Sequence, residues 1–544
     1  MRRTLTLILL LLAGIHRAGA GKGDGEQLQP RLVVGIVVDQ MRYDYLYRFY
    51  DQYGENGFRR LMKEGMNFTW AHYNYIPTYT GPGHSTIYTG TPPCNHGIIS
   101  NDWYDRKSGK TVYCSSDPDV KAVGSSNANG RMSPKNLLGT TMTDQLRLSN
   151  NGLSRVFAIS IKDRASVLPG GHMANAAYWY DEKSGNVVTS TWYMQELPAW
   201  VNAFNSRKLS LDLMSRDWQL DPAKDYRVSM PDDGPGERDI FREGKTTFPH
   251  VFTSLSDTLK REALKATPAG SEFLADLFTD LLKNEQPGKQ GSCDFVAVSF
   301  SSPDYIGHVY GPNSLEIMDA YLKLDRQIAR MLDTLDRYAG KGNYLVFLTA
   351  DHGVKPNNAL LSARRIPAGN VSVRDMNKKI SAAFTARFGS RRILQAIQEN
   401  QVYLDHAVID SLKLNLGEVT SFTTSFLRSE FPFIGKIENR DELAGKSPER
   451  SMNAFLLNGF NIARSGDIVF ELTQNQIFSE SNEGTSHESS FGYDTHVPML
   501  FFGWHVKAGE SNAPVYVVDI APTVCNLIHI QEPDACIGIP LIKY

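Results

Sequence analysis

The sequence has few cysteines, and none of them lies in a pattern that is typical of a thiolate metal site. None of the five belongs to a Cys-x-x-Cys pair, which argues against a zinc site built on cysteine. An odd number leaves at least one thiol unpaired in an exported protein. Two pairs are close enough in sequence to form disulfides, and the pairing stays open: Cys94 with Cys114, and Cys525 with Cys536.

The chain also lacks a strong charge of one sign and a long apolar segment in its body. Its formal net charge is −2 and its isoelectric point is about 6.7, so it has no basic field of the kind that attracts nucleic acid. No stretch after residue 20 is long and apolar enough to span a bilayer. We therefore expect no nucleic-acid partner and no stable membrane insertion.

The first twenty residues, MRRTLTLILLLLAGIHRAGA, have the pattern of a secretory signal peptide. Two arginines precede a short apolar run, and Ala18-Gly19-Ala20 offers small residues for cleavage. No cysteine lies near that point, which argues against a bacterial lipid anchor. We expect residues 1–20 to be removed and the mature protein to be periplasmic or secreted. The sequence leaves the oligomeric state open, and a monomer is compatible with it.

Short apolar runs in the body of the chain end abruptly in polar residues. Continuous Val, Ile, Leu and Phe of this length is typical of strands buried on both faces. Between them, residues 314–338 carry apolar side chains at spacings of three and four, which predicts a helix, and Asn313 with Glu316 resembles a capping box at its start. The sequence predicts an α/β fold with a largely parallel central sheet sandwiched by helices. The predicted strands lie in residues 31–39, 155–163, 294–304, 343–353 and 496–503.

Two stretches do not follow this alternation of strands and helices. Residues 185–290 and 355–480 are rich in charge, glycine and proline. The mature chain also exceeds the size at which one hydrophobic core usually stops growing. We expect one catalytic domain, residues 21–544, in which these two stretches are insertions that cap or flank the site.

Carboxylates and imidazoles lie at or near the ends of the predicted strands. A single aspartate after a strand more often caps a turn. Ligands of α/β sheets, however, bind beyond the carboxyl ends of the strands, where these side chains would converge. Without thiolates the set suits zinc, and it is too large for one tetrahedral ion, so we expect two ions about 4 Å apart. The candidates are Asp39, Asp304, His308, Asp351, His352 and His487.

Lys162 and Arg164 form a cationic pair in the stretch IKDR. Two residues apart at a predicted strand end, they are expected to project to one face. Either they are solvated charges, or an anion lies between them. Beside two metal ions we favour a phosphate group, because arginine can bind two of its oxygens at once.

The segment YIPTYTGPGHSTIYTG, residues 75–90, places several hydroxyls around a Gly-Pro-Gly turn before a predicted helix. Serine and threonine at such a position usually cap backbone amides. The segment alone therefore does not distinguish a helix cap from a nucleophile.

Taken together, these motifs resemble the alkaline phosphatase superfamily, and more closely its PafA-type bacterial phosphatases. The resemblance covers nearly the whole mature chain and implies an alkaline-phosphatase-like fold with a threonine nucleophile. It rests on VVGIVVDQMR, IPTYTGPGHSTIYTG, NDWYD, IKDRASVLPGGH, DYIGHVYGPNS, LTADHG and GTSHESSFGYDTHVPMLFFG.

The resemblance implies a role for each candidate residue. Thr80 would be the nucleophile, and Asn101, Lys162 and Arg164 would bind phosphate oxygens. His496 competes as a ligand, but it opens a strand, so His487 is preferred. One zinc ion would be held by Asp39, Asp351, His352 and the Thr80 oxygen, and the other by Asp304, His308 and His487.

The implied function is that of an exported zinc-dependent alkaline phosphatase. It would hydrolyse small phosphate monoesters to inorganic phosphate through a phosphothreonine intermediate.

A phosphodiesterase or nucleotide pyrophosphatase of the same superfamily is the nearest alternative, and the Lys162 and Arg164 pair distinguishes the two. A cofactor-independent phosphoglycerate mutase is disfavoured because such enzymes are cytosolic and this chain begins with a signal peptide. A sulfatase is disfavoured because the chain lacks the C/S-x-P-x-R motif. An alternative of another class is an exported phosphate-binding protein without turnover.

Overall fold

The computed structural model of the protein describes residues 28–543. The signal peptide expected at residues 1–20 lies outside the described residues. Within this part of the chain, no helix combines the length and the apolar character that a bilayer span requires. The five cysteines all fall within the described residues and are free thiols, so neither of the two pairs considered from the sequence is bonded.

A ten-stranded mixed sheet runs through the centre of the molecule, in the order β19-β2-β18-β11-β1-β10-β7-β8-β9-β6. Its five middle strands are parallel, from β11 to β8. Every residue of β1, β10 and β11 is buried, as expected for strands covered on both faces. The predicted α/β class is thereby confirmed. The parallel strands are β1 (Leu32–Val38), β7 (Val156–Ser160), β8 (Ala176–Asp181), β10 (Asp294–Phe300) and β11 (Tyr344–Thr349).

The edges of the sheet are built from shorter strands. Strand β18 pairs antiparallel with β11, so the last of the predicted strands reverses direction relative to the other four. At the other edge, β9 pairs antiparallel with both β8 and β6. The edge strands are β2 (Met66–Phe68), β6 (Ala122–Val123), β9 (Asn186–Ser190), β18 (Met499–Gly503) and β19 (Gly509–Ser511).

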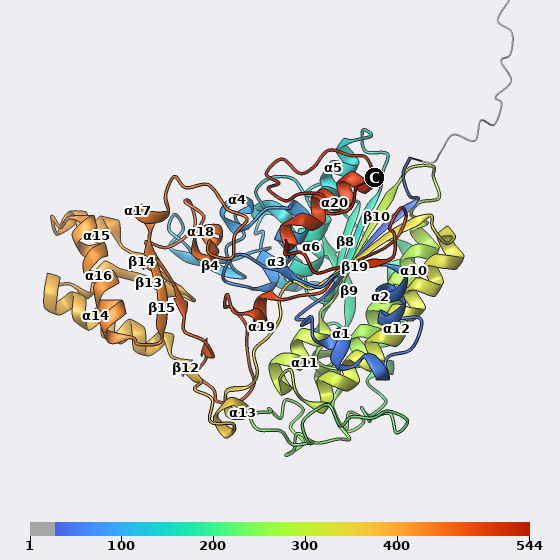
Figure 1. Cartoon of the computed structure of the whole chain (residues 1–544), viewed down its shortest axis with the longest axis horizontal. Coiled ribbons are helices and arrows are strands. Elements are labelled where there is room, and N and C mark those ends of the chain that lie inside the picture. Colours follow the sequence, from blue (N-terminus) through green and yellow to red (C-terminus); the bar gives the residue numbers. More distant parts are fainter. Residues whose placement is uncertain (1–27, 544) are drawn as a thin grey trace, which may run out of the picture.

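Helices cover both faces of the sheet (Figure 1). On one side α10 (Pro268–Glu285) packs along α12 (Leu315–Ala339), and α11 (Ser302–Tyr310) contacts both. On the other, α3 (Thr80–Thr89) packs on α6 (Arg164–Gly170), with α20 (Ile520–Leu527) beside α3.

The start of α12 differs from the sequence prediction. Its N-cap is Ser314, whose hydroxyl accepts a hydrogen bond from the Ile317 amide, so the predicted Asn313 capping box is wrong. Glu316 lies in the first turn of the helix, where its side chain is buried. The carboxylate of Glu316 is therefore in the interior of the protein, although it belongs to the first turn of the helix.

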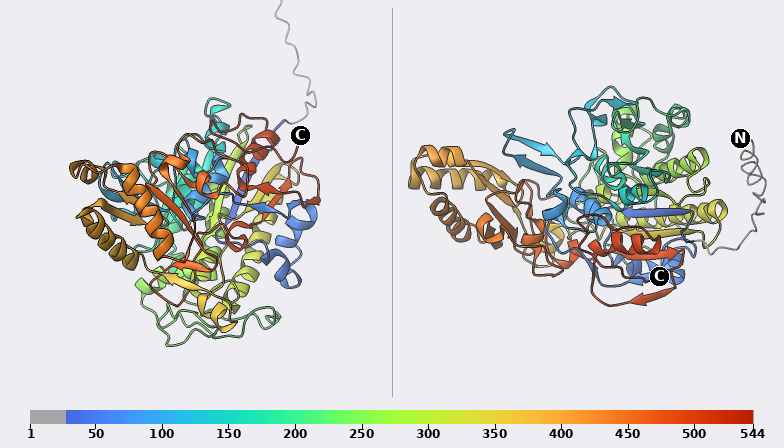
Figure 2. Two further views of the ribbon diagram at one scale, coloured as in Figure 1. Left: turned by 60° about the vertical axis from the view of Figure 1, so that its left-hand side comes forward. Right: turned by 90° about the horizontal axis from the view of Figure 1, so that it is seen from above.

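A second, smaller unit lies to one side of the central sheet, coloured orange in Figures 1 and 2. It has a four-stranded sheet of order β13-β14-β16-β15 and a hydrophobic core of its own. The turn between β13 and β14 reaches back to the main body, where Glu399 accepts a hydrogen bond from Ser100. The unit contains α14 (Val373–Phe388), β13 (Leu394–Gln398), β14 (Gln401–Leu404), α15 (His406–Ser411), α16 (Leu416–Glu430), β15 (Ile434–Asn439) and β16 (Ile468–Leu472).

Another irregular stretch lies at the lower edge of Figure 1, in green, beside α11 and α13 (Asn358–Ala363). Residues 214–256 contain no helix or strand beyond an isolated bridge between Trp218 and His250. They follow α7 (Ala199–Ser206) and α8 (Leu209–Leu213) and lead into α9 (Asp257–Ala263). They pack against α11 and the start of α12, where the Arg238 amide donates to the Val309 carbonyl and the Met230 amide donates to the Asn313 carbonyl.

Candidate metal centre

Acidic and imidazole side chains gather at the carboxyl ends of the parallel strands. Asp39 directly follows β1, and Asp351 and His352 lie just beyond the end of β11. Strand β10 ends at Phe300, however, and Asp304 lies in the first turn of α11, so its predicted place at a strand end is wrong. The helix explains its spacing to His308. Residues four apart share one helix face, and Asp304 Oδ1 lies 3.2 Å from His308 Nε2.

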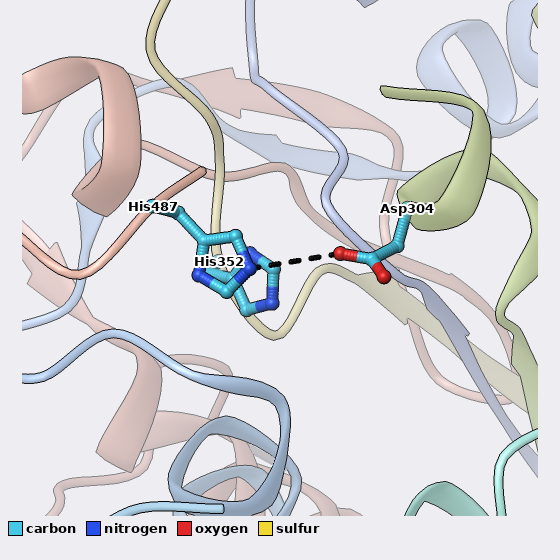
Figure 3. A group of neighbouring side chains, drawn as sticks. All are labelled: Asp304, His352 and His487. Atoms are coloured by element: carbon cyan, nitrogen blue, oxygen red, sulfur yellow. Dashed lines mark ion pairs between the residues drawn. The ribbon is translucent and has the colours of Figure 1, made fainter. Parts of the chain in front are cut away.

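These side chains form two groups that share His352. One contains Asp39, Asp351 and His352, and the other contains Asp304, His352 and His487. Within each group the potential ligand atoms all lie within 4.8 Å of one another, and every member is buried. Figure 3 shows the rings of His352 and His487 lying over each other beside the carboxylate of Asp304.

The three imidazoles are all oriented in the same way. The Nδ1 atoms of His308, His352 and His487 lie 2.8, 2.9 and 2.6 Å from backbone carbonyl oxygens. A carbonyl oxygen only accepts, so each Nδ1 carries the proton and donates it. The lone pair is thereby on Nε2, which faces the carboxylates. Metal-binding histidines are oriented by hydrogen bonds of this kind.

Three buried polar atoms in the first group have no hydrogen-bond partner: Asp39 Oδ1, Asp351 Oδ2 and His352 Nε2. His352 Nε2 lies 3.5 Å from each of the two carboxylate oxygens. Lone pairs that face one another inside a protein are costly to bury. A cation placed among them would satisfy all three, so this donor set fits a metal ion.

The electrostatics of the centre point the same way. Burial, and after it the neighbouring Asp351, raise the pKa of the Asp39 carboxyl well above its usual range. Burial raises the pKa of Asp351 to about 6 and lowers the pKa of His487 to about 3. The imidazole is thus neutral, and both carboxylates are costly to ionise. A bound cation reverses that cost, because it favours the ionised carboxylates.

Thr80 opens helix α3 next to these two groups. Its side-chain oxygen lies 3.3 Å from Lys162 Nζ and 3.5 Å from Arg164 Nη2. Thr78 and Thr86 are engaged elsewhere, with the Ser489 carbonyl and with His96. Thr80 is therefore the hydroxyl of this segment that faces the cationic pair.

Lys162 and Arg164 lie close together, but the predicted reason, a shared face at a strand end, is wrong. Strand β7 ends at Ser160, so the two residues do not share a strand face: Lys162 lies in a bend after the strand, and Arg164 opens α6. Both side chains nevertheless reach Thr80. Lys162 Nζ lies 2.6 Å from Asp39 Oδ2 and 2.5 Å from Asp304 Oδ2, and thus between the two groups of ligands.

Contacts around the cationic pair fix two further side chains. Arg164 Nη1 donates to the Tyr113 hydroxyl at 3.0 Å, and that hydroxyl donates in turn to Asp163. Asn101 Oδ1 accepts a hydrogen bond of 2.8 Å from the Gly81 amide. The side-chain oxygen of Asn101 is thereby occupied, and its side-chain nitrogen remains available as a donor.

Two residues at the centre were missed from the sequence. Gln40 donates from its backbone amide to Asp351 Oδ1 at 3.0 Å, and from Nε2 to Asp304 Oδ1 at 2.8 Å, so it ties the two groups together. His84 Nδ1 lies 2.9 Å from the Thr80 carbonyl oxygen and 3.3 Å from Asp351 Oδ2. The available signals were weak: Gln40 immediately follows Asp39, and His84 lies one helical turn after Thr80.

The competing histidine, His496, lies outside the centre. Its Nε2 atom is 2.8 Å from the Thr69 carbonyl, and its ring stacks on Tyr43 and on His72.

A cavity of about 590 Å³ adjoins the centre at His308. Its walls combine apolar and cationic side chains, among them Tyr305, His308, Phe241, Leu259, Lys265 and Arg238.

Comparisons with known proteins identify the family to which the chain belongs. Residues 33–494 match the family model described as type I phosphodiesterase / nucleotide pyrophosphatase. The chain is 41% identical over 517 residues to alkaline phosphatase PafA of Elizabethkingia meningoseptica, covering 95% of this chain and 94% of that protein. It is 42% identical over 516 residues to alkaline phosphatase PhoV of Synechococcus elongatus, covering 94% and 92%. The crystal structure of wild-type PafA matches with a TM-score of 0.89 at 40% identity, covering 94% of this chain and 98% of that one.

Proposed function

Since this chain belongs to the type I phosphodiesterase / nucleotide pyrophosphatase family and is an alkaline phosphatase of the PafA type, we propose that it hydrolyses phosphate monoesters with Thr80 as the nucleophile and two zinc ions as cofactors. The observation that carries the proposal is the position of the Thr80 hydroxyl. It lies against Lys162 and Arg164, at the start of a helix and beside two groups of buried metal ligands.

The ligand sets suggest how the ions would be held. Asp39, Asp351 and His352, with the Thr80 oxygen, would bind one ion. Asp304, His308 and His487 would bind the other. Oxygen and imidazole donors without thiolates support zinc. When bound, such ions lower the pKa of a coordinated hydroxyl and stabilise negative charge on a leaving oxygen.

The protein's own groups then carry out the displacement. Thr80 Oγ1 attacks phosphorus in line, the bond from phosphorus to the alcohol oxygen breaks, and a phosphothreonine forms. Water attacks the same phosphorus and releases phosphate, which restores the hydroxyl. The N-terminal end of α3 favours the negative charge that develops at Thr80. Throughout, Asn101, Lys162 and Arg164 hold the non-bridging oxygens, over which the transition-state charge is spread.

Monoester specificity rests on the cationic pair. A monoester dianion has one more charged oxygen than a diester, and two cations beside Thr80 complement it. The description of the matching family favours a phosphodiesterase or nucleotide pyrophosphatase as the second candidate. The Lys162 and Arg164 pair is the feature that supports the monoesterase over it.

One preparation tests the proposal. Its metal content is measured together with steady-state rates on a monoester and a diester of the same aryl alcohol. We expect about two equivalents of zinc and a strong preference for the monoester. Full activity in protein that contains no transition metal would contradict the metal assignment, and a preference for the diester would contradict the substrate class.

The domain organisation is also part of the proposal. We infer that residues 1–20 direct export and are removed, and that residues 21–544 form one catalytic domain with insertions at about 185–290 and 355–480. The hydrogen bond between Glu399 and Ser100, next to Asn101, supports a flanking role for the second insertion. Intact mass measurement of the exported protein tests the cleavage, since the first twenty residues should be missing.

A further inference from the structure

The cavity of about 590 Å³ beside His308 is lined by residues of α11, α9 and the irregular segment 214–256. Its volume is in the range of about 300–1,000 Å³ that is usual for small-molecule sites. Lys162 and Arg164, which are proposed to bind the phosphoryl group, are not among the residues of its wall. The cavity therefore offers space for another part of a substrate.

A single aromatic ring separates this cavity from the groups around Thr80. Tyr305 lies in the cavity wall, and the Nζ atoms of Lys162 and Lys265 lie 5.0 and 5.2 Å from the centroid of its ring. Lys265 lines the cavity, whereas Lys162 Nζ is 3.3 Å from the Thr80 side-chain oxygen. The cavity is thus directly beside the proposed place of phosphoryl transfer.

His308 is the accessible member of its group of metal ligands. Its side chain is 29% exposed, whereas those of Asp304 and His487 are each 3% exposed. His308 also lines the cavity. A substituent that extends toward solvent from this group of ligands therefore passes His308 and enters the cavity.

The direction of the proposed displacement brings the alcohol to the same side. Thr80 Oγ1 attacks from the group of ligands that contains Asp39. In an in-line reaction the bond that breaks points away from the attacking oxygen, and thus toward the group that contains Asp304 and His308. The carbon skeleton of the alcohol continues beyond that bond, where the cavity lies.

The cavity wall has a large apolar part. Phe241, Leu255 and Leu259 contribute apolar side chains, and the ring of Tyr305 adds an aromatic face. Such a surface binds the apolar body of a ligand by removing it from water.

The wall also carries positive charge that the protein does not neutralise. Lys265 forms an ion pair with Glu182, and Glu262, the other carboxylate of the wall, lies near Lys265 as well. Arg238 and Arg242 are the remaining cations of the wall. Among the residues that the structure describes, no carboxylate forms an ion pair with either arginine. The two guanidinium groups are therefore free to bind an anion.

We propose that this cavity binds the alcohol portion of the substrate, and that it favours phosphate monoesters whose alcohol combines an apolar or aromatic body with an anionic group. The body would pack on Phe241 and Leu259, and the anionic group would face Arg238 and Arg242. The assignment rests on the proposed function, because it takes Thr80 as the attacking group.

The first test compares phenyl phosphate with para-carboxyphenyl phosphate in the zinc-loaded mature protein. The measured quantity is the ratio of kcat/KM for the carboxylated ester to that for phenyl phosphate. Because each variant is compared with the parent, the intrinsic reactivity of the two alcohols cancels. We expect this ratio to fall about threefold in Arg242→Gln and about tenfold in the double variant with Arg238→Gln. Both arginines are exposed, so neither change removes a buried contact.

Arg227→Gln is the matched control for this experiment. Arg227 is an exposed arginine of the same irregular segment that does not line the cavity, so its substitution should leave the ratio unchanged. Zinc content is measured in every variant, because Arg238 Nη2 lies 3.4 Å from the His308 carbonyl oxygen. An unchanged ratio in the double variant would overturn the proposal.

The second test measures binding without turnover. A hydroxynaphthalene sulfonate is an aromatic alcohol with an anionic group, and its fluorescence reports binding to the zinc-loaded protein. We expect it to bind more tightly than unsubstituted naphthol, and about tenfold more weakly to the double variant than to the parent. Equal affinities for the two naphthols would contradict the anion site.

The two tests separate this inference from the proposed function. Hydrolysis of phenyl phosphate without any preference that depends on the arginines would leave the phosphatase in place and refute the alcohol site. Tight binding of the sulfonate by a protein that hydrolyses no monoester would refute the phosphatase and retain the anion-binding cavity.

Discussion

The imidazole rings of His352 and His487 stack with their centroids 3.5 Å apart and their planes inclined by 16°. His487 donates its Nδ1 proton to the Thr78 carbonyl, two residues before Thr80. His352 follows β11, and its Nε2 atom faces Asp39 and Asp351. The stack therefore holds the two groups of ligands at a short and fixed separation. Two metal ions that act on one phosphoryl group require such a fixed spacing.

The nucleophile is tested by Thr80→Ala. We expect kcat/KM on an aryl phosphate to fall by about a thousandfold or more, because the attacking oxygen is removed. No phosphorylated protein should be trapped on acid quenching, whereas the parent should yield phosphothreonine. Ser85→Ala is the matched control: it removes a buried hydroxyl of the same helix and should leave turnover nearly unchanged. Near-normal turnover by Thr80→Ala would show that water or another hydroxyl attacks directly.

The cationic pair is tested by Lys162→Ala and Arg164→Ala, each assayed on a monoester and a diester of one alcohol. We expect each variant to lose about a hundredfold or more in monoesterase kcat/KM, because a charge on the transferred group is left unpaired. The diesterase rate should change little. Zinc content is measured alongside, since Lys162 also contacts Asp39 and Asp304. Equal losses on both substrates would contradict the assigned role.

The close packing of α3 on the end of β11 is tested by Gly83→Ala. A Cβ atom at position 83 would lie 2.2 Å from the Asp351 backbone oxygen, so the helix that carries Thr80 must move away. We expect a loss of stability of about 1–3 kcal/mol. Activity should fall by about a hundredfold, as a small misplacement of a reacting group allows. Gly492→Ala, where a Cβ atom meets nothing within 4 Å, is the control for both measurements.

The ion pair of His172 and Asp144, whose Nδ1 and Oδ2 atoms lie 3.2 Å apart, predicts a dependence of stability on pH. The hydrogen bond that His172 donates to the Asp144 carboxylate raises the pKa of His172 above its ordinary value. A raised pKa in the folded state stabilises the protein below the unfolded pKa of about 6.5. That contribution is lost as the pH rises through the folded value. His172→Gln should therefore lower the urea midpoint more at pH 5.5 than at pH 8.5, and an equal effect at both would contradict the pairing.

Local patterns predicted five of the ten strands of the central sheet, but not β8 or the edge strands other than β18. The runs ending at Asp39, Asp163, Gly353 and Gly503 each proved to contain a strand, because continuous apolar sequence reports burial on both faces. The convergence of the metal ligands followed from the rule that parallel strands present their carboxyl ends at one edge.

Contacts between distant segments could not be predicted in the same way. The strand before Asp304 ends early and a helix begins, and the same happens before Arg164. Gln40 pairs with Asp304, 264 residues away, and no local pattern indicates that. The cap of α12 is Ser314, one residue after the predicted Asn313, and its hydroxyl accepts from the Ile317 amide. The choice of Thr80 came from the family resemblance, and its contacts are visible only in three dimensions.

The small orange unit of Figure 1 has a hydrophobic core of its own, and the turn bearing Glu399 contacts Ser100 beside Asn101. Units with separate hydrophobic cores can unfold at different temperatures. Melting of this unit alone would release the support next to Asn101 while the ten-stranded sheet stayed intact. Heat inactivation should then precede the main calorimetric transition, and activity should return on cooling from the interval between them.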